Sequence, residues 1–407
     1  MRAEGGNIAG GRLPAAEGGK TELIGVCGGT VQLTDNDELH RYSQCLRGFV
    51  RVCFHLPLMF ALATFPPSAP ANEIVGRAPS GYSDPVDSDN EDEAEGVSVT
   101  PWLTLFGQVE LEWSREVLTS EHAGAEETAS ETTANFQLGF LVRPWSSSRL
   151  ELVLEYDTGS DLLKADEASV VFDAGRWQVR AGKFYTPLGR YWGNFVNDPM
   201  LNFGETRAVG LSLGYSNENV TDLSLMFYQG VADRGGRHAD ALDWSVSLES
   251  KPGQRLHLGL SYQSDLADSD ARLLRAVDNR FARKVDALGG FLRWSGPDYE
   301  ISFEALGALD SFSELQGDRS RPMAWNLEFE HLLHADLHLA WRLEGSRELE
   351  DQPGIQAGLA LIWQPTEHAS INVEYLHGKF KHGLAGNDDD EPYRHVDTVN
   401  ARVTIDF

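Results

Sequence analysis

The last nine residues of this 407-residue chain alternate strictly between apolar and polar side chains and end on a phenylalanine. Successive side chains of a β-strand point to opposite faces, so Val403 and Ile405 share one face with Phe407, while Arg402 and Asp406 lie on the other. A strand of this kind needs an apolar environment on one side and a polar environment on the other. The wall of a transmembrane β-barrel provides both, and so does a half-buried sheet of a soluble protein.

The same alternation recurs along the chain, in segments 103–113, 150–157, 325–330 and 337–344. In each segment leucine, valine or an aromatic residue occupies every second position, apart from Gly107, and acidic residues recur on the opposite face. A soluble β-sandwich would turn the acids to water and bury the apolar face. Alternation alone therefore leaves the barrel and the sandwich open.

The connections between these segments alternate in length. Seven short turns are expected, at 143–148, 173–175, 216–219, 251–254, 295–298, 331–336 and 364–368. Eight longer polar connections are expected, at 117–133, 158–164, 186–207, 231–240, 265–283, 310–322, 347–353 and 381–394. Bacterial outer-membrane barrels have short periplasmic turns on one rim and long external loops on the other. The sequence therefore predicts an all-β fold, a transmembrane antiparallel β-barrel of about 16 strands over residues 101–407.

The residues before the barrel predict export from the cytoplasm. Arg47 and Arg51 precede an apolar stretch at 52–65 and the small residues of 69–71, which predicts a signal peptide over 47–71, with a short buried segment as the alternative. Residues 1–46 are then expected to be a non-native N-terminal extension created by a start codon placed too far upstream. Residues 72–100 are rich in Asp and Glu and are predicted to be an acidic disordered segment, too short to form a plug domain.

Composition excludes several classes of protein. No run of about 18 apolar residues exists, which excludes a helical membrane protein. All three cysteines precede the predicted cleavage point, so thiolate metal sites and a cysteine nucleophile are excluded for the exported chain. The net charge of −28 argues against nucleic-acid binding. No Ser, His and acid constellation stands out, so we expect neither an enzyme nor a cofactor.

Two weak metal patterns are present. Histidines 331, 334 and 338 have a loose ligand-like spacing but straddle a predicted turn, and the acidic run 388–391 suits either a divalent cation or simple solvation. No metal site is predicted. Residues 265–284 are expected to form a basic amphipathic helix in an external loop.

A barrel of about 16 strands is wide enough for an aqueous channel. The polar faces of its strands would line this lumen with charges of both signs, and an acidic excess favours cations. The lumen-lining residues expected are Glu110, Glu112, Glu151, Glu155, Arg180, Arg293, Glu328, Arg342, Glu344, Glu374 and Arg402.

The third long connection carries the most specific motif. It opens with Gly-Lys-Phe-Tyr-x-Pro-Leu-Gly at 182–189, continues with Asn-x-x-x-Asp-Pro at 194–199 and closes with Gly-Glu-Thr-Arg at 204–207. This pattern resembles the LbtU family of siderophore porins, most sharply over residues 183–214. The resemblance implies a plugless barrel that admits ferric siderophore without TonB-type energised machinery. Members of that family often carry a coiled coil ahead of the barrel, and residues 72–100 show no heptads.

A loop of this composition is expected to fold into the lumen and narrow it. Its cations, anions and aromatic rings would form the constriction and contact a ligand. The residues expected there are Lys183, Arg190, Tyr191, Trp192, Asp198, Glu205 and Arg207. For Glu205 and Arg207, which lie two residues apart, anchoring of the loop to the wall is the favoured interpretation.

The sequence thus predicts a porin of the bacterial outer membrane that takes up ferric siderophore. The alternative is a general or carbohydrate-type diffusion porin with a cation-leaning lumen. An outer-membrane hydrolase would be recognised by lipid hydrolysis. A scaffold barrel would be recognised by the absence of conductance. The expected partners are a small solute, membrane lipid, lipopolysaccharide and the barrel assembly machinery that acts on terminal phenylalanine signatures. Homotrimer formation is left open.

Overall fold

The computed structural model describes residues 96–121, 126–159, 162–217, 221–232, 242–269, 283–315, 320–382, 384–386 and 392–407. The predicted extension, the signal peptide, most of the acidic segment and the acidic run 388–391 lie outside these residues. So do residues 270–282 of the predicted amphipathic helix. Among the described residues, no helix is long and apolar enough to cross a membrane.

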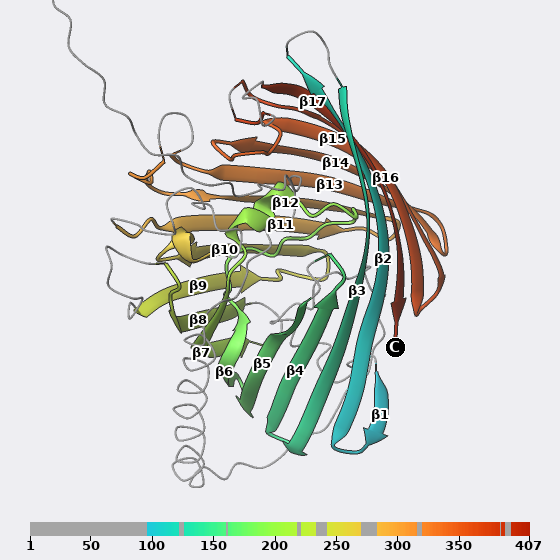
Figure 1. Cartoon of the computed structure of the whole chain (residues 1–407). Coiled ribbons are helices and arrows are strands. Elements are labelled where there is room, and N and C mark those ends of the chain that lie inside the picture. Colours follow the sequence, from blue (N-terminus) through green and yellow to red (C-terminus); the bar gives the residue numbers. More distant parts are fainter. Residues whose placement is uncertain are drawn as a thin grey trace, which may run out of the picture. The chain divides into compact units, whose positions relative to one another are not determined.

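Antiparallel strands form almost all of the described structure (Figure 1). They are β1 Val97–Thr100, β2 Leu103–Ser120, β3 Glu126–Trp145, β4 Ser148–Asp157, β5 Leu162–Ala174, β6 Trp177–Tyr185, β7 Arg207–Asn217, β8 Thr221–Gln229, β9 Leu242–Ser250, β10 Leu256–Gln263, β11 Ala287–Ser295, β12 Tyr299–Ala308, β13 Met323–His334, β14 Leu337–Arg347, β15 Ile355–Thr366, β16 Ala369–Lys379 and β17 Tyr393–Asp406. Two short 3-10 helices, η1 Met200–Gly204 and η2 Leu266–Asp268, lie in the connections.

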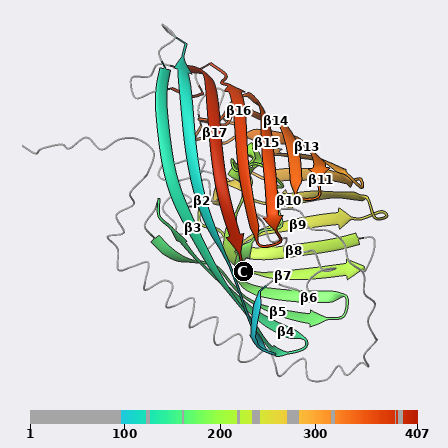
Figure 2. The same ribbon diagram turned by 90° about the vertical axis from the view of Figure 1, so that its right-hand side faces the viewer.

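Each strand from β2 to β17 pairs with its neighbours in the sequence, and β17 pairs with β2, which closes a barrel of sixteen strands. Figure 2 shows β17 lying beside β2 with the C-terminus at its end. The last residue takes part in the closure, because the Phe407 amide donates to the Gly107 carbonyl at 3.0 Å and the Gly107 amide donates to the Phe407 carbonyl at 2.8 Å. The predicted fold class is confirmed.

The seven predicted short turns coincide with connections of two to five residues between strand ends, on one rim of the barrel. The first external loop is shorter than expected. Strands β2 and β3 continue in register as far as Thr119 and Glu126, within the segment 117–133 that was expected to be a loop. Residues 126–133 are mostly Glu, Thr and Ser, so they carry no apolar face from which a strand would be recognised.

A short strand adds to the barrel where β17 ends. Residues Val97–Thr100, at the end of the segment expected to be disordered, form β1 and pair with Leu103 to Leu105 of β2. This stretch of β2 lies beyond Gln108, the last residue that β17 covers. Strand β1 therefore covers an edge that β2 would otherwise leave open.

The outer surface is apolar. Leu111, Val373 and Ile405 each expose about half of their surface, and large apolar side chains recur at every second position of the strands. Aromatic pairs lie near the strand ends, such as Trp177 with Tyr215 beside a short turn, their ring centroids 4.9 Å apart. An apolar band bounded by aromatic residues is typical of a barrel that faces lipid.

Leu361 tests this assignment, because it is 44% exposed on the outer face in the middle of β15, between Leu339 and Val373. Leu361→Arg is expected to lower the free energy of unfolding from lipid vesicles by about 2–4 kcal/mol, since the charge enters the bilayer. Urea titration measures this free energy of unfolding, and His368→Arg in the exposed turn is the control. An effect of Leu361→Arg no larger than the control would mean that water covers this face.

Candidate functional site: the loop inside the barrel

The long connection between β6 and β7, residues 186–206, lies inside the barrel. Figure 1 shows it in light green within the ring of strands. Its helix η1 packs against β12, β13 and β14, which lie on the opposite part of the wall. At its start, the Thr186 hydroxyl donates to the Gln263 side chain of β10 at 2.9 Å. The loop therefore crosses the lumen, as a constriction must.

Apolar side chains hold the loop to two patches of the inner wall. Leu201 and Phe203 belong to a buried cluster that also contains Leu306 of β12. Further along the wall, Phe195 packs with a second buried cluster that contains Ile362 of β15. Apolar residues on an inward face break the polar pattern of the strands, and they mark the area that the loop covers.

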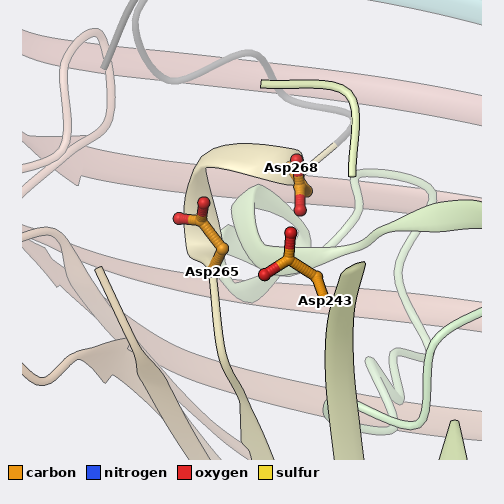
Figure 3. Close-up of side chains that lie close together, drawn as sticks. All are labelled: Asp243, Asp265 and Asp268. Carbon is orange, nitrogen blue, oxygen red and sulfur yellow. The ribbon is translucent and has the colours of Figure 1, made fainter. Parts of the chain in front are cut away.

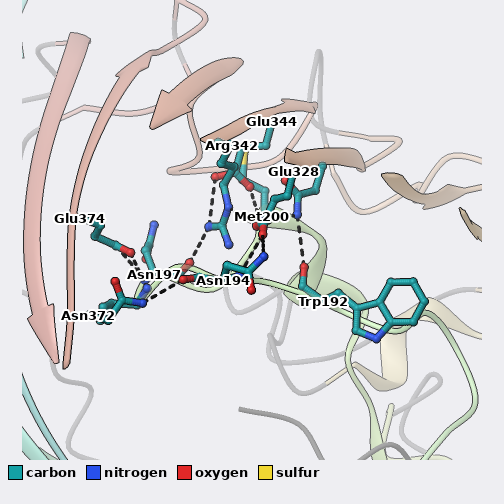
Figure 4. A network of polar contacts seen from close by, with 11 residues as sticks. Trp192, Asn194, Asn197, Met200, Glu328, Arg342, Glu344, Asn372 and Glu374 are labelled. Atoms are coloured by element: carbon teal, nitrogen blue, oxygen red, sulfur yellow. Dashed lines mark hydrogen bonds and ion pairs between the residues drawn. The ribbon is translucent and has the colours of Figure 1, made fainter. Parts of the chain in front are cut away.

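Carboxylates of the wall accept hydrogen bonds from the backbone of the loop (Figure 4). The acceptors come from neighbouring strands: Glu304 from β12, Glu328 from β13, Glu344 from β14 and Glu374 from β16. The bonds are Arg190 N to Glu304 at 2.6 Å, Asn194 N to Glu328 at 2.9 Å, Met200 N to Glu344 at 2.9 Å and Asn197 N to Glu374 at 2.9 Å, with Val196 N donating to Glu374 as well. These bonds satisfy amides that the loop cannot pair within itself.

Arg342 of β14 lies at the centre of this network. Its Nε donates to Glu328 at 2.7 Å, one terminal nitrogen donates to the Asn197 carbonyl at 2.5 Å, and its guanidinium lies 4.3 Å from the centroid of the Phe195 ring. The Arg342 side chain is completely buried, and Glu344 lies 3.7 Å away. One cation thus joins two wall carboxylates to the loop.

This arrangement corrects part of the predicted lumen lining. Glu328, Arg342, Glu344 and Glu374 project inward from their strands, but each exposes at most 2% of its surface. They contact the loop and not channel water, because the loop needs acceptors for its amides. Three inward amides that were not expected in the site also hold the loop network: Asn326 donates to Trp192 O at 3.3 Å, Asn372 to Asn194 O at 2.9 Å and Asn400 to Glu374 at 2.7 Å.

Two residues expected to contact a ligand are turned away from the lumen. Arg190 is 4% exposed and forms an ion pair with Glu249 of β9, while Tyr191 is 6% exposed and lies in the cluster around Leu201. Tyr191 has a φ of 52°, in the left-handed region, and this sharp turn directs its ring to the wall. The expectation that Arg190 and Tyr191 contact a solute is therefore wrong for this structure.

Two further residues belong to strands and not to the loop. Lys183 lies opposite Val209, and Arg207 lies opposite Tyr185, so both share a face with the outward-facing Val209. Lys183 donates to the Ala165 carbonyl at 2.8 Å, and Arg207 forms an ion pair with Asp166. Strand alternation starts both side chains on the outer face, but the Arg207 guanidinium lies 4.0 Å from Glu155, which projects inward.

Trp192 and Asp198 remain accessible from the lumen, and Glu205 is partly exposed at the end of η1. The guanidinium of Arg293 lies 4.9 Å from the centroid of the Trp192 ring. Asp198 interacts electrostatically with Arg402, and its charge also acts on Glu110 and Glu112. Across the narrowed lumen, Asp198 thus faces two carboxylates and one guanidinium of β2 and β17.

The other predicted lumen charges form pairs. Arg180 contacts Glu151 at 2.9 Å and Glu167 at 2.7 Å. Glu155 pairs with Lys164 at 3.1 Å, and Arg293 pairs with Glu300 at 2.7 Å. The net charge of these parts of the wall is therefore close to zero. The excess of acidic over basic side chains in the lumen lies beside Asp198.

No protein-family model matches the chain, and no curated protein matches it in sequence. Solved structures do match its fold, each over 75% of this chain: the outer-membrane channel DcaP of Acinetobacter baumannii (14% identity, 97% of that chain, TM-score 0.54), an anion-selective porin from Comamonas acidovorans (12%, 99%, 0.55) and Salmonella typhi OmpF in complex with daunomycin (12%, 97%, 0.52). The fold is therefore that of an outer-membrane porin. With its apolar exterior, it places the protein in the bacterial outer membrane.

The ion cluster around Arg342 gives a stability prediction. Arg342→Ala leaves Glu328 and Glu344 buried without their cation, which is expected to lower the free energy of unfolding by about 3–5 kcal/mol. Heat-modifiable gel mobility and urea titration measure the change. Arg347→Ala at the end of the same strand, where the side chain is 70% exposed, is expected to have an effect below about 1 kcal/mol. Equal effects of the two substitutions would show that the buried cluster does not hold the loop.

Proposed function

We propose that this protein is a passive diffusion channel for small solutes whose constriction prefers cations. The observation that carries the proposal is the charge balance of the narrowed lumen. Asp198, Glu110 and Glu112 stand against Arg402, whose guanidinium lies 3.6 Å from Glu110, while the buried Arg342 also acts on Asp198. Carboxylates at a narrow, low-dielectric point attract cations and repel anions.

The position of the acids strengthens this proposal. Most inward carboxylates of the wall are neutralised by arginine or lysine, or covered by the loop, so they contribute little to the field in the channel. Asp198 is exposed on the loop itself, at the point where the loop approaches β2 and β17. A solute passing the loop must therefore pass an acidic group.

Asp198→Asn tests the proposal in planar bilayers. In a KCl gradient the wild type is expected to show a reversal potential of cation-selective sign. The variant should shift this potential toward zero by removing one of the three carboxylates. Asp336→Asn, in the turn between β13 and β14, is the matched control and should leave the potential unchanged. An anion-selective wild type, or a variant that keeps the wild-type potential, contradicts the proposal.

Ferric siderophore is the second candidate substrate, supported by the resemblance of segments 182–189, 194–199 and 204–207 to siderophore porins. The half-buried Trp192 ring, with Arg293 over its face, provides an aromatic and cationic surface for an aryl or chelate group. Arg190 and Tyr191 provide no such surface here, because both are buried. The candidate site for siderophore therefore shrinks to Trp192 and Arg293.

Uptake of labelled ferric siderophore by an iron-limited deletion strain decides between the two candidates. If siderophore is the substrate, wild-type protein restores uptake and Trp192→Ala lowers it several-fold, while Trp145→Ala on the outer surface does not. Restored uptake of small sugars or amino acids, with iron uptake unchanged, would leave the general diffusion channel as the function.

Three partners follow from the same proposal. The strand that ends on Phe407 is a signal for the barrel assembly machinery, and the external rim contacts lipopolysaccharide. We also propose a homotrimer, because the apolar outer face of the strands can be covered by another subunit as well as by lipid. Chemical cross-linking in native membranes would detect it.

A further inference from the structure

Three aspartates meet beside η2 (Figure 3). Asp243 is at the start of β9, Asp265 is the N-cap of η2 after β10, and Asp268 is the last residue of η2. One carboxylate oxygen from each lies within 4.8 Å of the others, and the three residues expose at most 2% of their surface. Acids packed so closely repel one another unless a positive charge lies between them.

Described residues already contact two of these three acids. One oxygen of Asp243 accepts from Ser264 Oγ at 3.0 Å and pairs with the Lys284 ammonium. Asp265 accepts from the Ala267 and Val285 amides at 3.2 and 3.3 Å. These contacts place one described cation beside three carboxylates.

Asp268 provides the second observation. Its Oδ1 accepts from the Val231 and Ala232 amides, at 2.8 and 2.9 Å, which fixes the carboxylate in place. Its Oδ2 is buried and has no hydrogen-bond partner among the described residues, and Figure 3 shows the Asp268 carboxylate beside that of Asp243. Burial and the neighbouring Asp265 and Asp243 raise the pKa of Asp268 to about 7. A buried carboxylate oxygen that is held in place and has no hydrogen-bond partner can act as a ligand of a cation.

We propose that Asp243, Asp265 and Asp268 bind one Ca²⁺ ion. Ca²⁺ takes oxygen ligands at about 2.3–2.6 Å in a flexible geometry, so one ion can contact three oxygens that lie within 4.8 Å of one another. Mg²⁺ requires a near-octahedral geometry and keeps several of its waters, which suits an enclosed group of three carboxylates less well. The ion would join the connection after β8, through Asp268, to β9 and to the connection after β10.

Terbium luminescence measures this site, because Tb³⁺ replaces Ca²⁺ and Trp244 adjoins Asp243 as a sensitiser. Purified, refolded wild type in detergent is expected to bind one Tb³⁺ that Ca²⁺ displaces. Asp268→Asn keeps an Oδ1 that accepts from Val231 and Ala232 but removes the charge, so binding should weaken by at least about tenfold. Asp310→Asn, an exposed acid paired with Arg283 at 2.6 Å in the next loop, should bind as wild type does.

Background binding by the acidic run 388–391 is removed by making all comparisons in a protein with those four acids changed to Asn or Gln. Heat-modifiable gel mobility shows whether each variant is folded. If Asp268→Asn does not fold, Asp243→Asn replaces it in the same titration. The proposal is overturned if a folded aspartate variant binds Tb³⁺ as tightly as the protein that lacks only the four acids of 388–391. It is also overturned if that protein binds no Tb³⁺ that Ca²⁺ can displace.

Discussion

A backbone in lipid must satisfy every N–H and C=O group within the protein, and this constraint determines the architecture. Strands satisfy it only when the sheet closes, and the pairing of β17 with β2 completes that closure. A closed barrel of sixteen strands encloses a wide lumen. The loop between β6 and β7 occupies part of it, and its own amides then need acceptors. Glu304, Glu328, Glu344 and Glu374 provide them.

The wall glutamates therefore act mainly as structural acceptors. An ionised carboxylate accepts several hydrogen bonds at once, so one side chain can hold two successive amides, as Glu374 does with Val196 and Asn197. Arg342 offsets the repulsion between Glu328 and Glu344 and also binds the loop carbonyl of Asn197. Loss of this single cation would leave a buried acidic patch, which explains why the arginine is enclosed so completely.

Strand pattern and connection length were sufficient to predict the barrel, its closure and the location of its turns. This is because lipid on one face of the wall and water on the other require apolar side chains at every second position of a strand. They did not predict which inward acids meet water. That depends on contacts between the loop and strands more than 100 residues away, such as Asn194 with Glu328. The aspartate cluster was missed for the same reason, since Asp243 lies at the start of β9 and Asp265 lies in the connection after β10. Inward apolar residues such as Leu306 and Ile362 were the available signal for the covered wall.

The loop also changes what net charge implies for selectivity. An excess of acids over the whole chain says little about the channel when many of those acids are paired or covered. The carboxylates that matter for selectivity lie where the loop approaches the opposite wall. They are Asp198 on the loop and Glu110 and Glu112 on β2. A related barrel with the same wall but a different loop would therefore present different charges, because the loop determines both which wall acids are covered and which new ones are added. Selectivity in this architecture is a property of the loop more than of the strands.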